Sequence, residues 1–284
     1  MNLIYPHAEH WTQKDIISHV ADCARVCYAS ESTSRNSDEK LIKGLETRKH
    51  TSMFRHESRY FIIAKHECPT YNQICAELNK YKYCPYISYK IVYGTIYIST
   101  NGDFYRNNKY RKLLDFIWSY QVNYAVFENT EIGYTMMRYT ICVVTQISTS
   151  RELNRTSPNN IAEQSTRYVN FGKKGGITIC LPHWWHEVST FKRILHRCYW
   201  KSCELMYNLL LKLGFKPEDA RGVLPLDTAT QVIYTYTIDE WRHILALRLY
   251  GATGKPHPNA KEVAAEIATA LELAGQNVDE ELCK

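Results

Sequence analysis

Long apolar stretches are missing from this sequence. No run approaches the roughly 20 residues that a membrane-spanning helix needs, so we expect no membrane segment. The start of the chain, MNLIYPHAEHW, lacks the basic and apolar regions of a signal peptide. Charged residues make up 23% of the chain and hydrophobic residues 45%, which is ordinary for a soluble globular protein. These features together predict a protein of the cytoplasm.

Several common ligand-binding and catalytic motifs are missing as well. There is no GxGxxG or GxxxxGK[ST] loop and no GxSxG turn, which argues against a dinucleotide-binding Rossmann fold, a P-loop and a nucleophile elbow. The ten cysteines form no CxxC pair, and several occupy apolar positions, as reduced core cysteines do. A zinc site from Cys198, Cys203 and His196 is an alternative, but its spacing matches no ligand pattern. We therefore expect no metal.

Strong charge of one sign is also absent. The net charge of +6 suits anionic small molecules as well as nucleic acid. No run of five or more basic residues marks a nucleic-acid-binding tail. We expect small-molecule ligands and no nucleic acid.

Apolar periodicity predicts a mixed α/β fold. Helical spacing recurs over 13–29, from Ser37 onward, and over 71–81, 109–127, 189–213, 217–221, 239–250 and 259–274. Strands are predicted for RYFIIAK, YISYKIVYGTIYIST, MRYTICVV, GGITICLP and TQVIYTYT, and Asn101-Gly102 is a hairpin-turn signal. The apolar stripe of the helix at 189–213 is expected to be buried. No linker divides the chain, so we predict one domain, 1–284, with an inserted subregion at about 66–135.

A polar stretch separates two of these strands. It reads SRELNRTSPNNIAEQSTRYVNF and carries arginines, hydroxyls, an amide and a carboxylate. Guanidinium groups and hydroxyls match phosphate oxygens, and a polar loop between buried strands is a common place for a ligand site. A solvated connecting loop is compatible with the same residues.

Two further segments carry candidate groups. In DEWRHILALR, Arg248 lies near an apolar helix face, where a cation is costly unless an anion meets it; a snorkelling surface arginine is the alternative. In KHTSMFRH, His50 and His56 could be acid/base groups or ligands, or they could be packing residues.

In their order along the chain, these segments resemble the flavin-dependent thymidylate synthase family. KHTSMFRH is similar to the family's Gly-His-x-(Ser/Thr/Ala)-x-x-Glu-His, and CARVCYASES to its early Cys-Tyr helix end. RELNRTSPNNIAEQSTRYVNF resembles the signature Arg-His-Arg-x-x-Ser-x-(Asn/Ala)-(Glu/Gln)-x-Ser-x-Arg-Tyr. ARGVLP resembles Ala-Arg-x-Val-Leu-Pro, and TIDEWRHILALR with a trailing His257-Pro258 resembles Arg-Glu-Trp-Arg-His-Phe-Phe-x-Leu-Arg and a His-Pro. The inserted subregion looks like that of longer members.

The resemblance implies a homotetramer of mixed α/β subunits, each with a central sheet flanked by helices, and active sites at subunit interfaces. The implied reaction converts dUMP into dTMP. Methylenetetrahydrofolate supplies the carbon, and FAD reduced by NADPH supplies the hydride. The family uses no cysteine nucleophile, which agrees with the lack of a cysteine in an activating sequence environment.

The resemblance also assigns residues to the substrate and the cofactors. Arg248 is expected to hold the uracil ring and stabilise negative charge on it, an electrostatic role that can replace a covalent nucleophile, and Ser165 is a second catalytic candidate. The implied dUMP contacts are Glu152, Arg155, Glu163, Gln164, Ser165, Arg167, Arg221 and Arg248. The implied FAD and folate contacts are His50, Ser52, Arg55, Thr156, Ser157, Asp239 and His243.

The match is weaker on the cofactor side. Arg155-Thr156-Ser157 stands where the family has Arg-His-Arg, Arg55 where it has Glu, and Asp239 where it has Arg. Losing a phosphate-paired arginine costs about 1.5–3 kcal/mol, unless neighbouring basic residues such as Arg55 compensate. Two alternatives therefore remain: another flavin- and folate-dependent C5 modification of a pyrimidine nucleotide, such as hydroxymethylation, and a non-catalytic nucleotide-binding tetramer.

Overall fold

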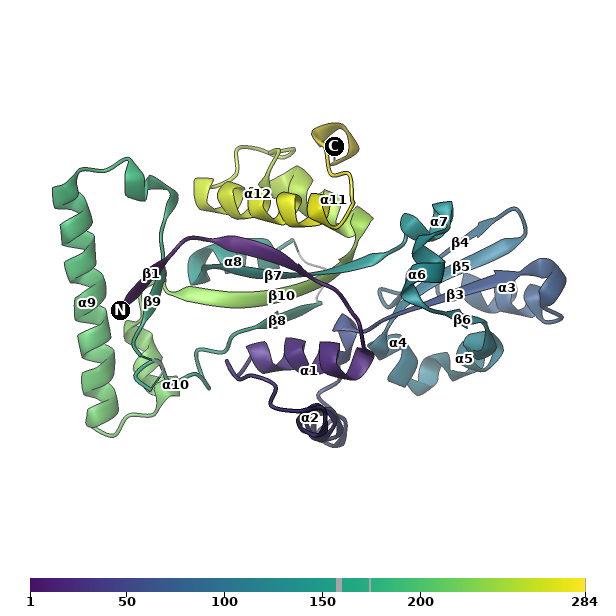
Figure 1. Ribbon diagram of the computed structural model, residues 1–284, viewed down its shortest axis with the longest axis horizontal. Helices are drawn as coiled ribbons and strands as arrows, with labels where there is room; N and C mark the ends of the chain where they lie inside the picture. Colours follow the sequence, from purple (N-terminus) through teal and green to yellow (C-terminus); the bar gives the residue numbers. More distant parts are fainter. Residues whose placement is uncertain (157–159, 174, 284) are drawn as a thin grey trace.

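Two antiparallel sheets organise the chain (Figure 1), as seen in a computed structural model that describes residues 1–156, 160–173 and 175–283. The central sheet has the strand order β2-β7-β10-β8, with bounds His7–Trp11, Arg138–Gln146, Ala229–Thr237 and Ile161–Glu163. Beside it, β1 (Asn2–Ile4) pairs in parallel with β9 (Thr178–Cys180). The prediction of a mixed α/β fold is confirmed.

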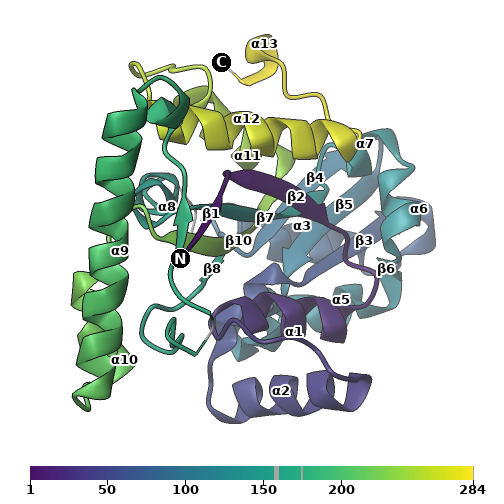
Figure 2. The ribbon, with the colours of Figure 1, turned by 60° about the vertical axis from the view of Figure 1, so that its left-hand side comes forward.

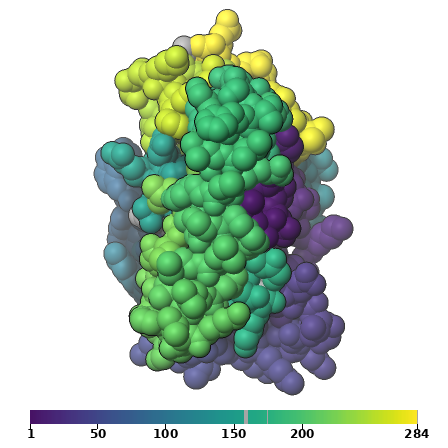
Figure 3. Space-filling view, turned by 90° about the vertical axis from the view of Figure 1, so that its left-hand side faces the viewer, coloured from purple at the N-terminus to yellow at the C-terminus, as the bar shows by residue number. Residues whose placement is uncertain are grey.

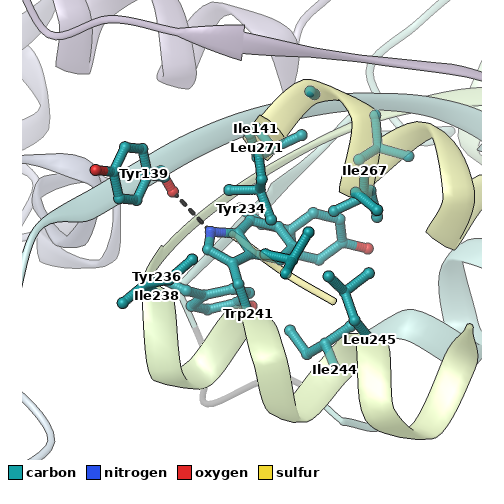
Figure 4. Packing of buried hydrophobic residues seen from close by; sticks show 14 of the residues in the cluster. Tyr139, Ile141, Tyr234, Tyr236, Ile238, Trp241, Ile244, Leu245, Ile267 and Leu271 are labelled. Atoms are coloured by element: carbon teal, nitrogen blue, oxygen red, sulfur yellow. Dashed lines mark hydrogen bonds between the residues drawn. The ribbon is translucent and has the colours of Figure 1, made fainter. Parts of the chain in front are cut away.

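One face of the central sheet is aromatic and apolar. Pairing of β7 with β10 places Tyr139 opposite Tyr236 and Ile141 opposite Tyr234. The helices α8 (Ile147–Asn154), α11 (Ile238–Arg248) and α12 (Pro258–Leu273) cover this face (Figures 1 and 2). Trp241 of α11 is packed at its centre and donates its indole N–H to the Tyr139 carbonyl at 3.1 Å (Figure 4). Each large side chain buried here contributes about 1.5–3 kcal/mol.

The opposite face of the sheet packs against α1 (Ile16–Val26), followed by α2 (Arg35–Thr47) and the 3-10 turn η1 (Thr51–His56). The Asp15 carboxylate caps α1 by accepting from the Ser18 amide. Cys23 of α1 packs on Cys142 and Ile233. The second predicted helix begins at Arg35, two residues before the predicted start at Ser37, because the Ser34 hydroxyl caps it by accepting from the Ser37 amide.

The second sheet has the order β4-β5-β3-β6 and its own apolar core. Its strands are Ile87–Val92, Thr95–Asn101, Ser58–Ala64 and Gln121–Val122. The associated helices are α3 (Tyr71–Asn79), α4 (Gly102–Arg106), α5 (Arg111–Ile117), α6 (Tyr124–Glu128) and α7 (Glu131–Tyr134). Most of this region coincides with the predicted insertion, but β3 precedes it in sequence.

Two predictions within this second region are wrong. The helix expected over 109–127 is interrupted, because Gln121–Val122 leaves the helical path and pairs with β3. The hairpin turn lies at Tyr93-Gly94, where both residues have positive φ, of 48° and 77°. Asn101 instead caps α4, accepting from the amides of Asp103 and Phe104. Gly102 is needed for space, since a Cβ there would lie 2.5 Å from the Phe54 carbonyl oxygen.

The long helix α9 (Thr190–Lys212) runs along one end of the molecule (Figure 3), near α10 (Pro217–Ala220); α13 (Glu280–Cys283) closes the described chain. The helix itself was predicted correctly, but its buried face was not. Trp200, Glu204 and Tyr207 point inward. Most of the apolar stripe that we expected to be buried lies on the surface, with exposed fractions of 47–74%: Phe191, Ile194, Leu195, Leu205, Met206, Leu209 and Leu213. None of the described helices is long and apolar enough to cross a membrane.

Candidate functional site

Glu163 lies at the end of β8 and its carboxylate is held by neutral donors. One oxygen accepts from the hydroxyls of Ser150 (2.7 Å) and Thr230 (3.3 Å), and the other accepts from the Asn154 amide (3.1 Å). Ser150 and Asn154 are four residues apart on α8, so they share one helix face. Among the described residues, no cation pairs with Glu163. The carboxylate is therefore oriented but not neutralised.

The polar segment after β8 rests on a fixed backbone. The Gln164 amide donates to the Gln231 carbonyl of β10 at 2.8 Å, and the Ser165 amide donates to the Cys27 carbonyl at 3.0 Å. The Ser165 hydroxyl accepts from the Arg167 amide at 3.2 Å. Since α1 and β10 are both parts of the central core, the polar side chains of this segment have a rigid support. This is the arrangement that the sequence predicted.

Two arginines lie at this segment. Arg221 follows α10 and donates to the Thr166 hydroxyl at 3.2 Å, and it has no carboxylate partner in the described part of the chain. Arg167 forms an ion pair with Glu218 at 2.8 Å, and hydrogen bonding to Arg167 lowers the pKa of Glu218. Arg221 is thus the cation that remains available to an anion next to Thr166.

Arg248 lies at the last position of α11, half-buried. One terminal nitrogen donates to the backbone carbonyl of Glu152, on α8, at 3.0 Å. Its Nε is buried without a hydrogen-bond partner, and no carboxylate pairs with it within the described residues. A half-buried guanidinium with an unsatisfied donor is costly until an acceptor, best an anion, reaches it.

The short helix α8 is contacted by both Glu163 and Arg248, but through different residues. Arg155, at the C-terminal end of α8, is exposed. No recorded interaction within the described chain joins Arg248 to the cluster of Ser165, Thr166 and Arg221. One chain therefore presents two partial clusters of the predicted substrate residues.

Three cysteines of the chain, Cys27, Cys142 and Cys180, are poor nucleophiles. Burial raises the pKa of the Cys27 thiol, whose backbone carbonyl holds Ser165. Burial also raises the pKa of Cys142 and of Cys180 to about 12. A thiol with a raised pKa carries little thiolate at neutral pH. In the part of the chain that is described, no three His, Cys, Asp or Glu side chains gather closely enough to hold a metal ion.

Four of the predicted cofactor-side residues lie on or next to η1 and α11. His50 and Ser52 are exposed, at and just before the start of η1, and Asp239 and His243 are exposed on α11. Asp239 lies 3.5 Å from Arg242.

Two other cofactor-side residues already have partners within the chain. Arg55 forms an ion pair with Asp103 at 2.6 Å, and the Thr156 hydroxyl donates to the Leu153 carbonyl at 2.8 Å. Ser157 lies outside the described residues.

A buried polar chain beneath η1 was not predicted. His19 of α1 contacts the Thr140 hydroxyl at 3.1 Å, Thr140 contacts Thr235 at 2.8 Å, and Thr235 contacts His56 Nδ1 at 2.8 Å. His56 is fully buried, and its Nε2 has no hydrogen-bond partner among the residues that the structure describes. Thr140 and Thr235 share their strand faces with other polar residues, among them Arg138, Gln146 and Gln231, so the sequence did not set them apart. The packing interpretation of KHTSMFRH holds for His56, whereas His50 is exposed.

Comparisons with known proteins identify a family for this chain. Residues 87–274, more than half of the chain, match the Thy1 family, described as thymidylate synthase complementing protein. A segment of 71 residues, 25% of this chain, is 37% identical to a probable flavin-dependent thymidylate synthase of Paramecium bursaria Chlorella virus 1. The chain spans about a third (32%) of the length of that relative.

Two solved structures also resemble the chain. They show a UMP/dUMP methylase, PolB, from Streptomyces cacaoi, bound with 5-Br UMP and with 5-Br dUMP. Both are 17% identical to this chain and align over 92% of their own length. They cover 96% and 97% of this chain, with TM-scores of 0.45 and 0.43.

The fold and the clusters define a mixed α/β protein with a polar, arginine-bearing site on rigid supports. With the match over residues 87–274, the chain belongs to the Thy1 family, that of the flavin-dependent thymidylate synthases.

Proposed function

We propose that the protein is a flavin-dependent thymidylate synthase that converts dUMP into dTMP. Methylenetetrahydrofolate is the carbon donor, and FAD, reduced by NADPH, supplies the hydride when bound. The observation that carries this proposal is Arg248, a half-buried cation whose Nε is unsatisfied and which lacks a carboxylate partner in the described chain. A pyrimidine ring that gains negative charge during activation provides the missing acceptor.

The other proposed substrate residues suit different parts of the nucleotide. Arg221 and the Thr166 hydroxyl, 3.2 Å apart, suit the phosphate of the nucleotide, since a guanidinium and a hydroxyl both donate to phosphate oxygens. Glu163 is held by three neutral donors and can only accept when ionised, so it suits an N–H group or a sugar hydroxyl. Ser165 lies between these groups in the chain and orients the segment through its bond to the Arg167 amide.

The residues assigned to FAD are compatible with a bound ligand. His50, Ser52 and His243 are exposed, and their side chains have no recorded hydrogen-bond partner within the described residues. We therefore assign these three residues to holding the flavin and folate. Arg55 is less suited to replace a phosphate-binding arginine, because Asp103 already pairs with it.

We also propose that the active protein is a homotetramer with its sites at subunit interfaces. The support is the apolar stripe of α9, which one chain leaves exposed, and the lack, among the described residues, of a hydrogen bond or ion pair that joins Arg248 to the Ser165–Arg221 cluster. Exposed apolar stripes of this size mark interaction surfaces. A second copy would both cover the stripe and supply missing residues to each cluster.

The oligomer is tested by light scattering. We expect a mass of four chains of 33.2 kDa for the wild type and smaller species for a Leu205→Asp, Leu209→Asp double variant. Leu273→Asp is the matched control, because Leu273 is 86% exposed but lies at the end of α12. A monomeric wild type, or an unchanged mass in the double variant, would contradict the proposed interface.

The function itself is tested by Arg248→Ala. We expect turnover of dUMP to fall by at least about 100-fold, the loss typical of removing one charge-stabilising donor, with an unchanged circular dichroism spectrum. Arg242→Ala is the control on the same helix, since Arg242 contacts the Asn277 carbonyl instead. Full activity of Arg248→Ala would refute the assigned role. A product other than dTMP would select a different C5 modification, and a wild-type protein that binds no FAD would exclude both enzymatic functions.

A further inference from the structure

The end of α2 has an unusual residue in a left-handed conformation. The His50 amide donates to the Leu45 carbonyl and the Lys49 amide donates to the Glu46 carbonyl. These two bonds form a Schellman motif, whose first residue after the cap is most often glycine. Here that residue is Lys49, with φ of 57°.

Other helices of the chain end in the same motif with glycine. Gly214 after α9 has φ of 91°, and Gly275 after α12 has φ of 85°; both show the same pair of amide-to-carbonyl bonds. After α1 the position is held by Ala29, with φ of 46° and the same two bonds. A side chain with a Cβ is strained in this region of φ. Of Ala29 and Lys49, the second alone has a charged side chain, and a strained position that carries a charge points to a role for that charge.

The Lys49 ammonium has no partner among the residues that the structure describes. Lys49 is exposed. The neighbouring Arg48 turns back to the Gly44 carbonyl at 3.0 Å, and the Glu46 carboxylate lies 3.4 Å from Arg106. The Glu46 carboxylate and the Gly44 carbonyl therefore already have arginine partners. Lys49 directly precedes His50 in the chain.

We propose that Lys49 is an anion-binding residue of the cofactor site. This inference rests on the proposed function, which places His50 and Ser52 at the flavin and folate. The anion is the diphosphate of FAD or a glutamate carboxylate of the folate. Lys49 then supplies a cation that the segment Arg155-Thr156-Ser157 lacks relative to the family signature.

The variant Lys49→Gly distinguishes anion binding by the lysine side chain from a purely structural role at the end of α2. Glycine relieves the strained backbone, so the variant is expected to melt at the wild-type temperature or up to roughly 3 °C higher. Its affinity for FAD or for tetrahydrofolate is expected to be about tenfold weaker or more, since a charge-assisted hydrogen bond is lost. Lys49→Arg keeps a cation and should restore binding. Tyr93→Gly is the control, because Tyr93 also has positive φ but lies in the β4–β5 hairpin.

The experiment titrates FAD, by flavin fluorescence, and tetrahydrofolate, by calorimetry, into each variant at low and high salt. A loss confined to FAD identifies the diphosphate as the anion, and a loss confined to tetrahydrofolate identifies the glutamate. Equal affinities of wild type and Lys49→Gly for both ligands would overturn the inference and leave the proposed function standing. A wild type that binds neither ligand would overturn both.

Discussion

The two faces of the central sheet carry different chemistry. On one face, Tyr139, Tyr234 and Tyr236 pack around Trp241 beneath α11 and α12 (Figure 4). On the other face, Thr140 and Thr235 occupy the alternate positions of the same strands and join His19 to His56. The first face stabilises the fold through the area that it buries. The second fixes η1 against the sheet through directional bonds, and so orients the segment that carries His50 and Ser52, which we propose as cofactor contacts.

The largest expected effect comes from the aromatic face. Trp241→Ala should lower the free energy of unfolding by about 3–5 kcal/mol, the usual cost of a large cavity, because Trp241 is almost fully buried. Urea denaturation at fixed protein concentration measures this loss. Trp118→Ala is the control, since Trp118 is 53% exposed on the second region. Equal losses for the two variants would contradict the view that this face is the main source of stability.

The polar face should respond to acid. Burial lowers the pKa of His56 to about 3 and that of His19 to about 4, from an ordinary 6.5. Below pH 6.5 the unfolded chain binds protons that the folded chain does not, so the free energy of unfolding falls as the pH falls toward 4. The slope is about 1.4 kcal/mol per pH unit for each histidine. Above pH 6.5 both histidines are neutral in the folded and in the unfolded chain, so neither contributes to this slope.

Unfolding measured from pH 7 to pH 5 tests this dependence. A His19→Gln variant should lose part of the slope, whereas Trp241→Ala should keep it, although its overall stability is lower. If His19→Gln has the wild-type slope, His19 is not one of the groups responsible.

The smallest expected effect is at the centre of the polar chain. Thr140→Val preserves the shape of the side chain but removes the hydroxyl shared by His19 and Thr235, which should cost about 1–3 kcal/mol. Thr140→Ser keeps the hydroxyl and serves as the comparison. Thermal unfolding of the two variants measures the difference, and a valine variant as stable as the serine variant would show that the bonds add nothing.

Local signals in the sequence predicted most elements of the fold. The apolar spacing of α1 and the apolar character of β7 and β10 each act over a few residues, and these three elements are present where they were predicted. The wrong predictions occur where contact with residues far away in the sequence determines the local structure. Residues 121–122 become a strand because β3 offers an edge, and Asn101 caps a helix because the chain turns toward Phe54.

The stripe of α9 shows a second limit of sequence analysis. Periodicity indicates that Leu205 and Leu209 need a partner surface, but it cannot tell whether that surface belongs to the same chain. For the candidate site, the sequence predicted the segment from Glu163 to Arg167 and the neighbouring Arg221, which the structure brings to Thr166. The His19–His56 chain was missed, because hydrogen bonds across four elements leave no periodic pattern.

The position of β3 makes the inserted region difficult to remove. Both backbone edges of β3 are paired with strands from the predicted insertion, β5 on one side and β6 on the other. Deleting residues 66–135 would leave β3 with two open edges, each a template for pairing with another chain. Since η1 ends at His56 and β3 begins at Ser58, a shortened chain would aggregate through the strand that directly follows the cofactor-side segment. A shorter version of this protein would need two new strands to replace β5 and β6 at the edges of β3.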